Sequence, residues 1–241
     1  ALRKHGKVPP PVPPHVAKHV DEARALYDLV KREGEPGAKG IVQVEHALGF
    51  AAGPVGPAGV TPRRVLDLGS GGGLPGLVLA YAWPDADLVL MDASARRTAF
   101  LESAVDTLAL AARVRVVRAR AESAGRVAAL RGRFDVVVAR GFGPPAVTAE
   151  CAAPFLQGGG RLLVSDPPVD SGYRTEEPGA IGAELAGETP DRWPAAGLDL
   201  VGLAVESAWT APFHYRSLVL TRPCPDRFPR RDGVPAKRPL F

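Results

Sequence analysis

A glycine-rich loop between two acidic residues is the feature of this sequence best suited to chemistry. The stretch VLDLGSGGGLPG, residues 65–76, follows an apolar run containing Asp67 with a loop that holds five glycines between Gly69 and Gly76. A second acid, Asp92, ends the next apolar run, 25 residues after Asp67. Glycines allow a backbone to approach a ligand closely, and carboxylates accept hydrogen bonds and attract cations. The pattern therefore predicts a cofactor site.

Two classes of cofactor fit such a loop. Residues 71–76 satisfy the pattern G-x-G-x-x-G, and Asp92 stands where an acid would bind a ribose, so a dinucleotide site is one interpretation. A nucleotide-binding P-loop is excluded, because the Lys-Ser/Thr ending of that motif is absent. Asp67 favours the second class, since a carboxylate repels a pyrophosphate but attracts the sulfonium and ammonium groups of S-adenosyl-L-methionine. A tight strand-to-helix turn without a ligand is the remaining alternative.

With S-adenosyl-L-methionine as the ligand, the loop glycines would admit the methionine part and Asp92 would accept hydrogen bonds from the two ribose hydroxyls. Pro75 would begin the following helix, where its missing donor is harmless. The cofactor residues expected from this stretch are Asp67, Gly69, Ser70, Gly71, Gly73 and Asp92.

Expected strands and helices alternate along the chain around the loop. Helical patterns near 75–83, 95–110, 122–131 and 145–156 separate apolar runs at about 64–68, 87–91, 113–117, 134–139 and 160–165. This order predicts an α/β fold with a parallel sheet covered on both faces, whose ligands lie beyond the carboxyl ends of the strands. Two later runs, about 199–207 and 213–221, are expected to add an antiparallel edge pair. Residues 166–196, rich in Gly, Pro and acids, are expected to form an insertion or loop with one short helix.

The regions outside the sheet differ in composition. Residues 1–14 form a Pro-rich segment, whose PPPVPP run is expected to be a stiff spacer outside the core. Residues 15–60 are expected to form a helical cap, with an amphipathic helix from His15 to Glu33 and a short helix through His46 and Leu48. The catalytic domain is expected over 61–222 and a basic tail over 223–241.

Composition bounds the class of protein. A chain of 241 residues with 46% apolar and 23% charged residues can bury one ample core. It has no run of about 18 apolar residues and no secretion signal, so we expect a soluble, cytoplasmic monomer without membrane contact. Cys151 and Cys224 give neither a disulfide framework nor metal-ligand spacing, and no metal is expected.

The positive charge is concentrated at the C-terminal end. Six cations and two anions lie between Arg222 and Phe241, a surplus equal to the net charge of +4 for the whole chain. Such a segment suits a phosphate backbone, although a solvated terminus is the commoner case. The cations favoured for RNA contact are Arg230, Arg231, Lys237 and Arg238, with Arg120 as a weaker candidate and Arg96 and Arg97 as either phosphate contacts or an exposed helix face.

Several motifs in order resemble those of a known family. They are LDLGSGGGLPGLVLA, MDASARRTAFL, RARAE, FDVVVARGF and FPRRDGVPAKRPL. The sequence resembles the small-subunit ribosomal RNA guanine-N7 methyltransferases, the RsmG or glucose-inhibited-division-B family, over roughly residues 64–165 and 214–240. The resemblance implies a Rossmann-like class I methyltransferase with a seven-stranded, mostly parallel sheet, S-adenosyl-L-methionine as cofactor, and 16S ribosomal RNA or the small ribosomal subunit as partner.

The same resemblance implies particular site residues. Gly69 and Leu74 of the loop, the pair Ala121-Glu122 and Arg140 correspond to cofactor positions, with Arg140 as the catalytic candidate. By their chemistry, a backbone amide and a carboxylate at Ala121-Glu122 could read the adenine edge, although an acid in the first turn of a helix is equally common. Arg140 directly follows a buried strand, where an arginine faces a ligand somewhat more often than it forms a surface ion pair.

Other residues leave alternatives open. Asp166-Pro167-Pro168 stands where the family usually has Lys-Gly, and it partly matches the signature of exocyclic-amine methyltransferases, but a loop start is favoured because Val169 replaces the aromatic residue. Phe142 could stack on a base or pack in the core, and His46 is more often a packed residue than a catalytic one. The function could therefore be guanine-N7 transfer to ribosomal RNA, methylation of a small metabolite, or RNA binding without catalysis.

Overall fold

The computed structural model describes residues 41–53, 55, 61–166, 191–211 and 213–241. The Pro-rich segment 1–14, the helix expected from His15 to Glu33 and most of the loop expected over 166–196 lie outside these residues.

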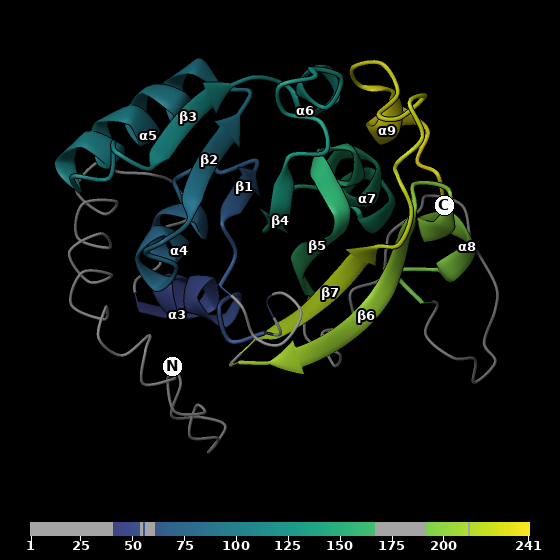
Figure 1. Ribbon diagram of the computed structural model, residues 1–241, viewed down its shortest axis with the longest axis horizontal. Coiled ribbons are helices and arrows are strands. Elements are labelled where there is room, and N and C mark those ends of the chain that lie inside the picture. The colour runs from purple at the N-terminus through teal and green to yellow at the C-terminus, as the bar shows by residue number, and fades with distance from the viewer. Residues whose placement is uncertain (1–40, 54, 56–60, 167–190, 212) are drawn as a thin grey trace, which may run out of the picture.

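A seven-stranded sheet with the order β3-β2-β1-β4-β5-β7-β6 forms the centre of the fold (Figure 1). Neighbouring strands from β3 to β5 are parallel, whereas β7 is antiparallel to both β5 and β6. This arrangement confirms the predicted parallel sheet with an antiparallel edge pair. The strands are β1 (Arg64–Leu68), β2 (Asp87–Asp92), β3 (Val114–Arg118), β4 (Phe134–Ala139), β5 (Leu156–Asp166), β6 (Leu203–Thr210) and β7 (His214–Leu220).

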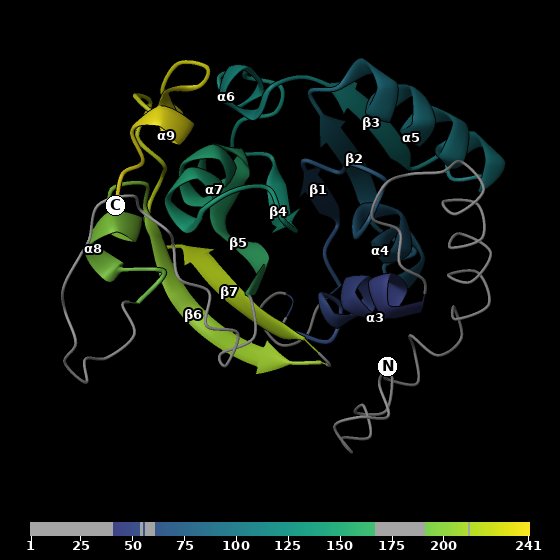
Figure 2. The same ribbon diagram turned by 180° about the vertical axis from the view of Figure 1, so that it is seen from behind.

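Helices cover both faces of the sheet, as its long apolar strands require (Figures 1 and 2). Helices α3 (Ile41–Gly49), α4 (Gly76–Ala82) and α5 (Ala95–Thr107) bury one core, and α6 (Ala121–Ala124), α7 (Pro145–Ala152) and α8 (Ala195–Asp199) bury the other. A short 3-10 turn, η3 (Ala153–Phe155), follows α7, and α9 (Val234–Lys237) lies in the C-terminal segment.

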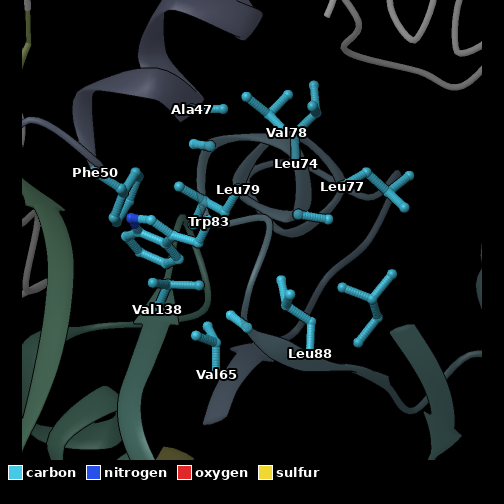
Figure 3. Close-up of a cluster of buried hydrophobic side chains, with 14 of the residues drawn as sticks. Ala47, Phe50, Val65, Leu74, Leu77, Val78, Leu79, Trp83, Leu88 and Val138 are labelled. Atoms are coloured by element: carbon cyan, nitrogen blue, oxygen red, sulfur yellow. The ribbon is translucent and has the colours of Figure 1, made fainter. Parts of the chain in front are cut away.

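Strand β4 shows how one apolar run serves two cores. Val136 and Val138 belong to the core under α4, while Val137 and Ala139 belong to the core under α7, because successive side chains of a strand point to opposite faces. Figure 3 shows the first core, where Trp83, directly after α4, lies between Phe50 and Val138. Such packing fixes where α4 begins and therefore where the glycine loop lies.

Several element boundaries differ from the sequence prediction. Strand β5 begins at Leu156 instead of about residue 160, and the helix expected over 145–156 ends at Ala152. The helix expected over 122–131 ends at Ala124, and the guanidinium of Arg131 instead donates to the carbonyls of Gly125, Cys224, Pro225 and Phe228. These bonds tie the turns after α6 to the C-terminal segment. The strand expected over 199–207 begins only at Leu203, because buried Leu198 and Val201 keep a helical spacing through α8 and the turn after it.

The C-terminal segment, residues 223–241, packs on the body of the protein. It runs beside α6 and α7 and carries α9 (yellow in Figure 1). Its aromatic residue Phe228 is buried in the second core, and Phe241 lies against Gly197 of α8. The expected basic tail is therefore a docked segment in this structure.

Candidate active site

The glycine loop follows β1 and crosses the end of β2. The amides of Gly69 and Ser70 both donate to the carbonyl of Met91 at 2.9 Å, which holds the loop on the neighbouring strand. Gly69 has φ +75°, and a Cβ there would lie 2.7 Å from Cδ2 of Phe142. The position therefore requires glycine for both its backbone conformation and its close contact with the residues after β4.

Asp67 lies beneath the loop and not at its mouth. Its side chain is 1% exposed, and its Oδ2 accepts a hydrogen bond of 3.0 Å from the amide of Gly76, the first residue of α4. A Cβ at Gly76 would lie 2.4 Å from Leu90 and 2.5 Å from that same carboxylate oxygen, so glycine allows α4 to start directly above the acid. Burial raises the pKa of Asp67 to about 6, although the bonds from Gly76 and Ser70 and the charge of Arg140 oppose the change.

Asp92 contacts the loop from the end of β2. Its Oδ2 accepts a hydrogen bond of 3.0 Å from the amide of Gly71, and its Oδ1 accepts one of 2.8 Å from the amide of Ser94. The guanidinium of Arg97 lies 3.5 Å from Oδ2. The carboxylate is thus fixed beside the loop, as the spacing of Asp67 and Asp92 predicts. Arg97 lies on an exposed face of α5, as one of its two interpretations has it, and also pairs with Asp92.

Arg140 stands after β4, next to the loop, since β4 pairs with β1 in the sheet. Its Nη1 donates to Oε1 of Gln43 on α3, a contact that joins the cap to the site. Burial lowers the pKa of Arg140, while the negative charge of Asp67 opposes this effect. The half-buried guanidinium therefore lies close enough to Asp67 for the two charges to attract each other.

An aromatic cluster anchors α3 beside Arg140. The rings of His46 and Phe213 stack with centroids 4.3 Å apart, and the hydroxyl of Tyr215 donates to the carbonyl of His46 at 2.8 Å. Burial, with the nearby charge of Arg140, lowers the pKa of His46 to about 4, so this ring is neutral at physiological pH. The sequence did not indicate the roles of Gln43 and Tyr215, because both contacts join segments nearly 100 residues or more apart.

The pair Ala121-Glu122 begins α6, and both residues are buried. The Glu122 carboxylate accepts hydrogen bonds from Arg120 Nη2 at 2.8 Å and from the amide of Gly233 at 2.9 Å. Arg120 is also 3.4 Å from Asp232, so this candidate RNA contact already has two acidic partners. A reading of the adenine edge by Glu122 remains a prediction.

The predicted RNA-contacting cations fall into two groups. Arg231, Lys237 and Arg238 have exposed side chains. Arg230 instead forms an ion pair of 2.6 Å with Glu150, a fully buried residue of α7. Its guanidinium is therefore engaged inside the protein, a difference that the adjacent sequence positions 230 and 231 do not reveal.

Asp166 ends β5 and has two donors. Arg216 Nε lies 2.9 Å from its Oδ2, and Trp193 Nε1 lies 3.1 Å from its Oδ1. The acid that replaces the family's usual Lys is thus neutralised within the fold. Its interpretation as the start of a loop stays a prediction, because residues 167–190 lie outside the described part of the chain. Beside Asp166, Phe142 and Trp193 line a small pocket of about 30 Å³ next to Gly141.

Within the described residues, no helix is long and apolar enough to cross a membrane. The same part of the chain contains no group of three or more His, Cys, Asp or Glu residues arranged to hold a metal ion.

The site has the features that S-adenosyl-L-methionine needs. An added Cβ at Gly71 would meet only the carbonyl oxygen of Gly69, 3.9 Å away, so the loop has room for a ligand at that position. The Asp92 carboxylate at the end of β2 can accept bonds from hydroxyls. Asp67 adds negative charge beneath the same loop, which suits a cation and opposes a pyrophosphate.

Known proteins with similar sequences and folds were identified. The profile of a family described as rRNA small subunit methyltransferase G (GidB) matches residues 57–165. Ribosomal RNA small subunit methyltransferase G of Prochlorococcus marinus (strain MIT 9303) is 38% identical over 182 residues, covering 74% of this chain and 68% of the relative. The protein of the same name from Rubrobacter xylanophilus is 37% identical over 211 residues, covering 83% and 73%.

Two solved structures share the fold at low sequence identity. An O-methyltransferase family protein from Burkholderia thailandensis has a TM-score of 0.51 and 20% identity, covering 85% of this chain and 61% of that chain. Cofactor-bound Rv0187 from MTB has a TM-score of 0.52 and 18% identity, covering 85% and 90%.

The strand order, the glycine loop and the acids of β1 and β2 define a Rossmann-like class I methyltransferase. The similar sequences identify one family within this class of methyltransferases. The chain belongs to the ribosomal RNA small subunit methyltransferase G family, which confirms the resemblance carried by its motifs.

Proposed function

We propose that this enzyme transfers a methyl group from S-adenosyl-L-methionine to N7 of a guanine in 16S ribosomal RNA of the small subunit. The observation that carries the cofactor assignment is the pair of buried carboxylates, Asp67 and Asp92, that flank the glycine loop. The RNA acceptor is supported by the names of the relatives, which are ribosomal RNA small subunit methyltransferases. The bound cofactor would supply an electrophilic methyl group.

The residues of the site have separate tasks in this proposal. The loop from Gly69 to Leu74 holds the methionine part, Asp92 accepts bonds from the ribose, and Ala121 with Glu122 borders the adenine. Arg140 contacts the cofactor at the side of the loop facing α3, where Gln43 holds its guanidinium. Guanine N7 has an in-plane lone pair and carries no proton, so the protein needs no general base and acts by aligning the reactants.

A second binding surface would hold the RNA. Arg231, Lys237 and Arg238 are exposed on the docked C-terminal segment and are proposed to contact phosphates. The ion pair between Asp166 and Arg216 reduces the repulsion that an unpaired acid near this substrate would cause.

The reaction is tested by incubating the protein and radiolabelled S-adenosyl-L-methionine with small-subunit RNA from cells lacking this enzyme, followed by mapping of the modified base. We expect label on one guanosine, at which treatment with borohydride and aniline cleaves the RNA strand, as N7 methylation of the base requires. Arg140→Ala should lower the rate by about a hundredfold or more, as the loss of a preorganised charged contact does elsewhere. Arg133→Ala is the matched control, because that exposed arginine lies just before β4 while Arg140 lies just after it. Absence of labelled RNA, or label on another base atom, would refute the assignment.

The cofactor class has a separate test. Isothermal titration should show binding of S-adenosyl-L-methionine and no binding of a nicotinamide dinucleotide. Asp67→Asn should weaken S-adenosyl-L-methionine, a sulfonium, more than S-adenosylhomocysteine, a neutral thioether, because the carboxylate attracts the positive charge. Equal losses for the two ligands would remove Asp67 from the recognition of charge.

RNA contact is tested by the salt dependence of binding. Replacement of Arg231, Lys237 and Arg238 by glutamine should reduce the slope of log K against log salt by about 2, since each phosphate contact on a single strand contributes roughly 0.7. An unchanged slope would exclude these side chains as phosphate contacts.

A further inference from the structure

The Glu122 carboxylate is held by groups outside α6. Its Oε1 accepts from the amide of Gly233, 111 residues further along the chain, at 2.9 Å and from Arg120 at 2.8 Å. Burial alone would raise the pKa of Glu122, but the bonds from Gly233 and Arg120 outweigh it and hold the pKa below its usual value. A backbone amide of the C-terminal segment therefore helps to set both the charge and the orientation of a side chain at the proposed adenine end of the site.

A buried ion pair fixes the segment three residues before Gly233. Glu150 is 0% exposed, and it accepts from the amide of Arg230 at 2.8 Å, from its Nε at 2.8 Å and from its Nη2 at 2.6 Å. A fully buried carboxylate is costly unless it is paired and hydrogen-bonded, and here one residue supplies all three donors. Glu150 thereby determines where the backbone at 230 lies.

A third set of contacts joins the segment to α6 itself. The hydroxyl of Ser123 lies 2.8 Å and 3.0 Å from the two carboxylate oxygens of Asp232. Pro229 packs against Gly125, where an added Cβ would lie 3.0 Å from its ring. Contacts at 229, 232 and 233 thus hold the segment along α6 and its C-cap Gly125, while the contact at 230 holds it on α7.

We propose that residues 228–233 are a positioning part of the cofactor site: the Glu150–Arg230 pair fixes the segment, and the segment fixes Glu122 and α6 for binding of the adenosyl group. The proposal rests on the proposed function, in which Ala121 and Glu122 border the adenine. Arg230 and Gly233 act through Glu122 and are positioning groups. Glu150 is fully buried and its hydrogen bonds come from Arg230, so the proposed route from Glu150 to the cofactor is through this segment.

The test measures the Kd of S-adenosyl-L-methionine by isothermal titration, together with KM and kcat for methyl transfer. Glu150→Gln keeps the shape of the side chain and leaves no unpaired buried anion. It removes the charge attraction to Arg230 and places an amide NH2, which is a donor, against the donors of the guanidinium. Asp232→Ala removes the contact with Ser123 and is milder for folding, because Asp232 is half exposed. Asp226→Ala is the matched control: it removes the same charge from the same segment, but its side chain is fully exposed and contacts Arg131 instead of α6.

We expect the cofactor Kd to rise about fivefold for Glu150→Gln and at least about threefold for Asp232→Ala, corresponding to the loss of roughly one hydrogen bond. The control should stay within about twofold of the wild type. The cofactor KM should rise in parallel, while kcat at saturating cofactor is retained. A purely structural role would lower the unfolding temperature and leave the Kd of the folded protein unchanged, so far-UV circular dichroism at the titration temperature accompanies each measurement.

The outcomes separate the two proposals. If the wild type binds the cofactor and both folded variants bind it as tightly, the positioning role is wrong and the proposed function stands. If the wild type binds no S-adenosyl-L-methionine, both proposals fail. Should Glu150→Gln not fold, Asp232→Ala alone decides the question.

Discussion

Replacing Asp67 by asparagine should change the dependence of stability on pH. The carboxyl has an ordinary pKa of 3.8 and a pKa of about 6 in the folded protein, because burial disfavours its charge. Between these values the folded state retains a proton that the unfolded state has released, so the free energy of unfolding falls as pH rises. The contribution of Asp67 to the free energy of unfolding is fully present below pH 3.8 and is lost as pH rises through 6. The total loss is about 3 kcal/mol, and about 2 kcal/mol of it occurs between pH 4 and pH 7.

Asparagine carries no charge at any of these pH values and still offers an oxygen to the amide of Gly76. Urea denaturation of the wild type and of Asp67→Asn, at pH 4, 5, 6 and 7, should show the variant gaining about 2 kcal/mol relative to the wild type over this range. Comparison with Asp226→Asn, whose side chain is fully exposed, controls for the loss of one surface charge. A stability difference between wild type and Asp67→Asn that stays constant from pH 4 to pH 7 would refute the account of Asp67 as a desolvated carboxyl.

Two further substitutions test the packing around the site. Gly76→Ala places a Cβ 2.4 Å from Leu90 and should destabilise the protein by about 1–3 kcal/mol, whereas Gly158→Ala, with no atom within 4 Å of the added Cβ, should be nearly neutral in the same denaturation assay; similar losses for both would argue against close packing at Gly76. Tyr215→Phe removes the bond to the carbonyl of His46 and should cost about 1 kcal/mol in thermal or urea unfolding, and no loss would show that this bond does not hold α3.

The sheet could be predicted from the sequence because each strand is an apolar run with polar or turn-forming residues on both sides. The observed strands β1 (Arg64–Leu68) and β4 (Phe134–Ala139) coincide with the expected runs, and the antiparallel edge pair follows from the short connection between its strands. The end of α6 could not be predicted in the same way. Residues after Ala124 have an acceptable helical pattern, but the helix ends at its C-cap Gly125, which lies against Pro229, and Arg131 bonds to carbonyls more than 90 residues away.

In the candidate site, too, local features could be predicted from the sequence and long-range contacts could not. Glycines and acids at strand ends are local signals, and the structure brings Asp92 and Gly71 together as their spacing suggests. The depth of Asp67 was not predictable, because it depends on how closely α4 approaches β1. Nor was the contact of Gln43 with Arg140, since nothing in the sequence of α3 indicates which loop it will cover.

The docked C-terminal segment changes how its positive charge is understood. The charge count of the sequence does not distinguish Arg230 from Arg231, yet Arg230 neutralises the buried carboxylate of Glu150 and Arg231 is exposed. Deleting residues 223–241 would therefore remove the cations proposed to contact RNA and, at the same time, leave Glu150 buried without a partner and Glu122 without the amide of Gly233. A loss of activity in that deletion would not distinguish RNA binding from cofactor binding. Single substitutions can separate the two effects, because the proposed RNA contacts Arg231, Lys237 and Arg238 are exposed, whereas Glu122 and Glu150, which hold the segment, are buried.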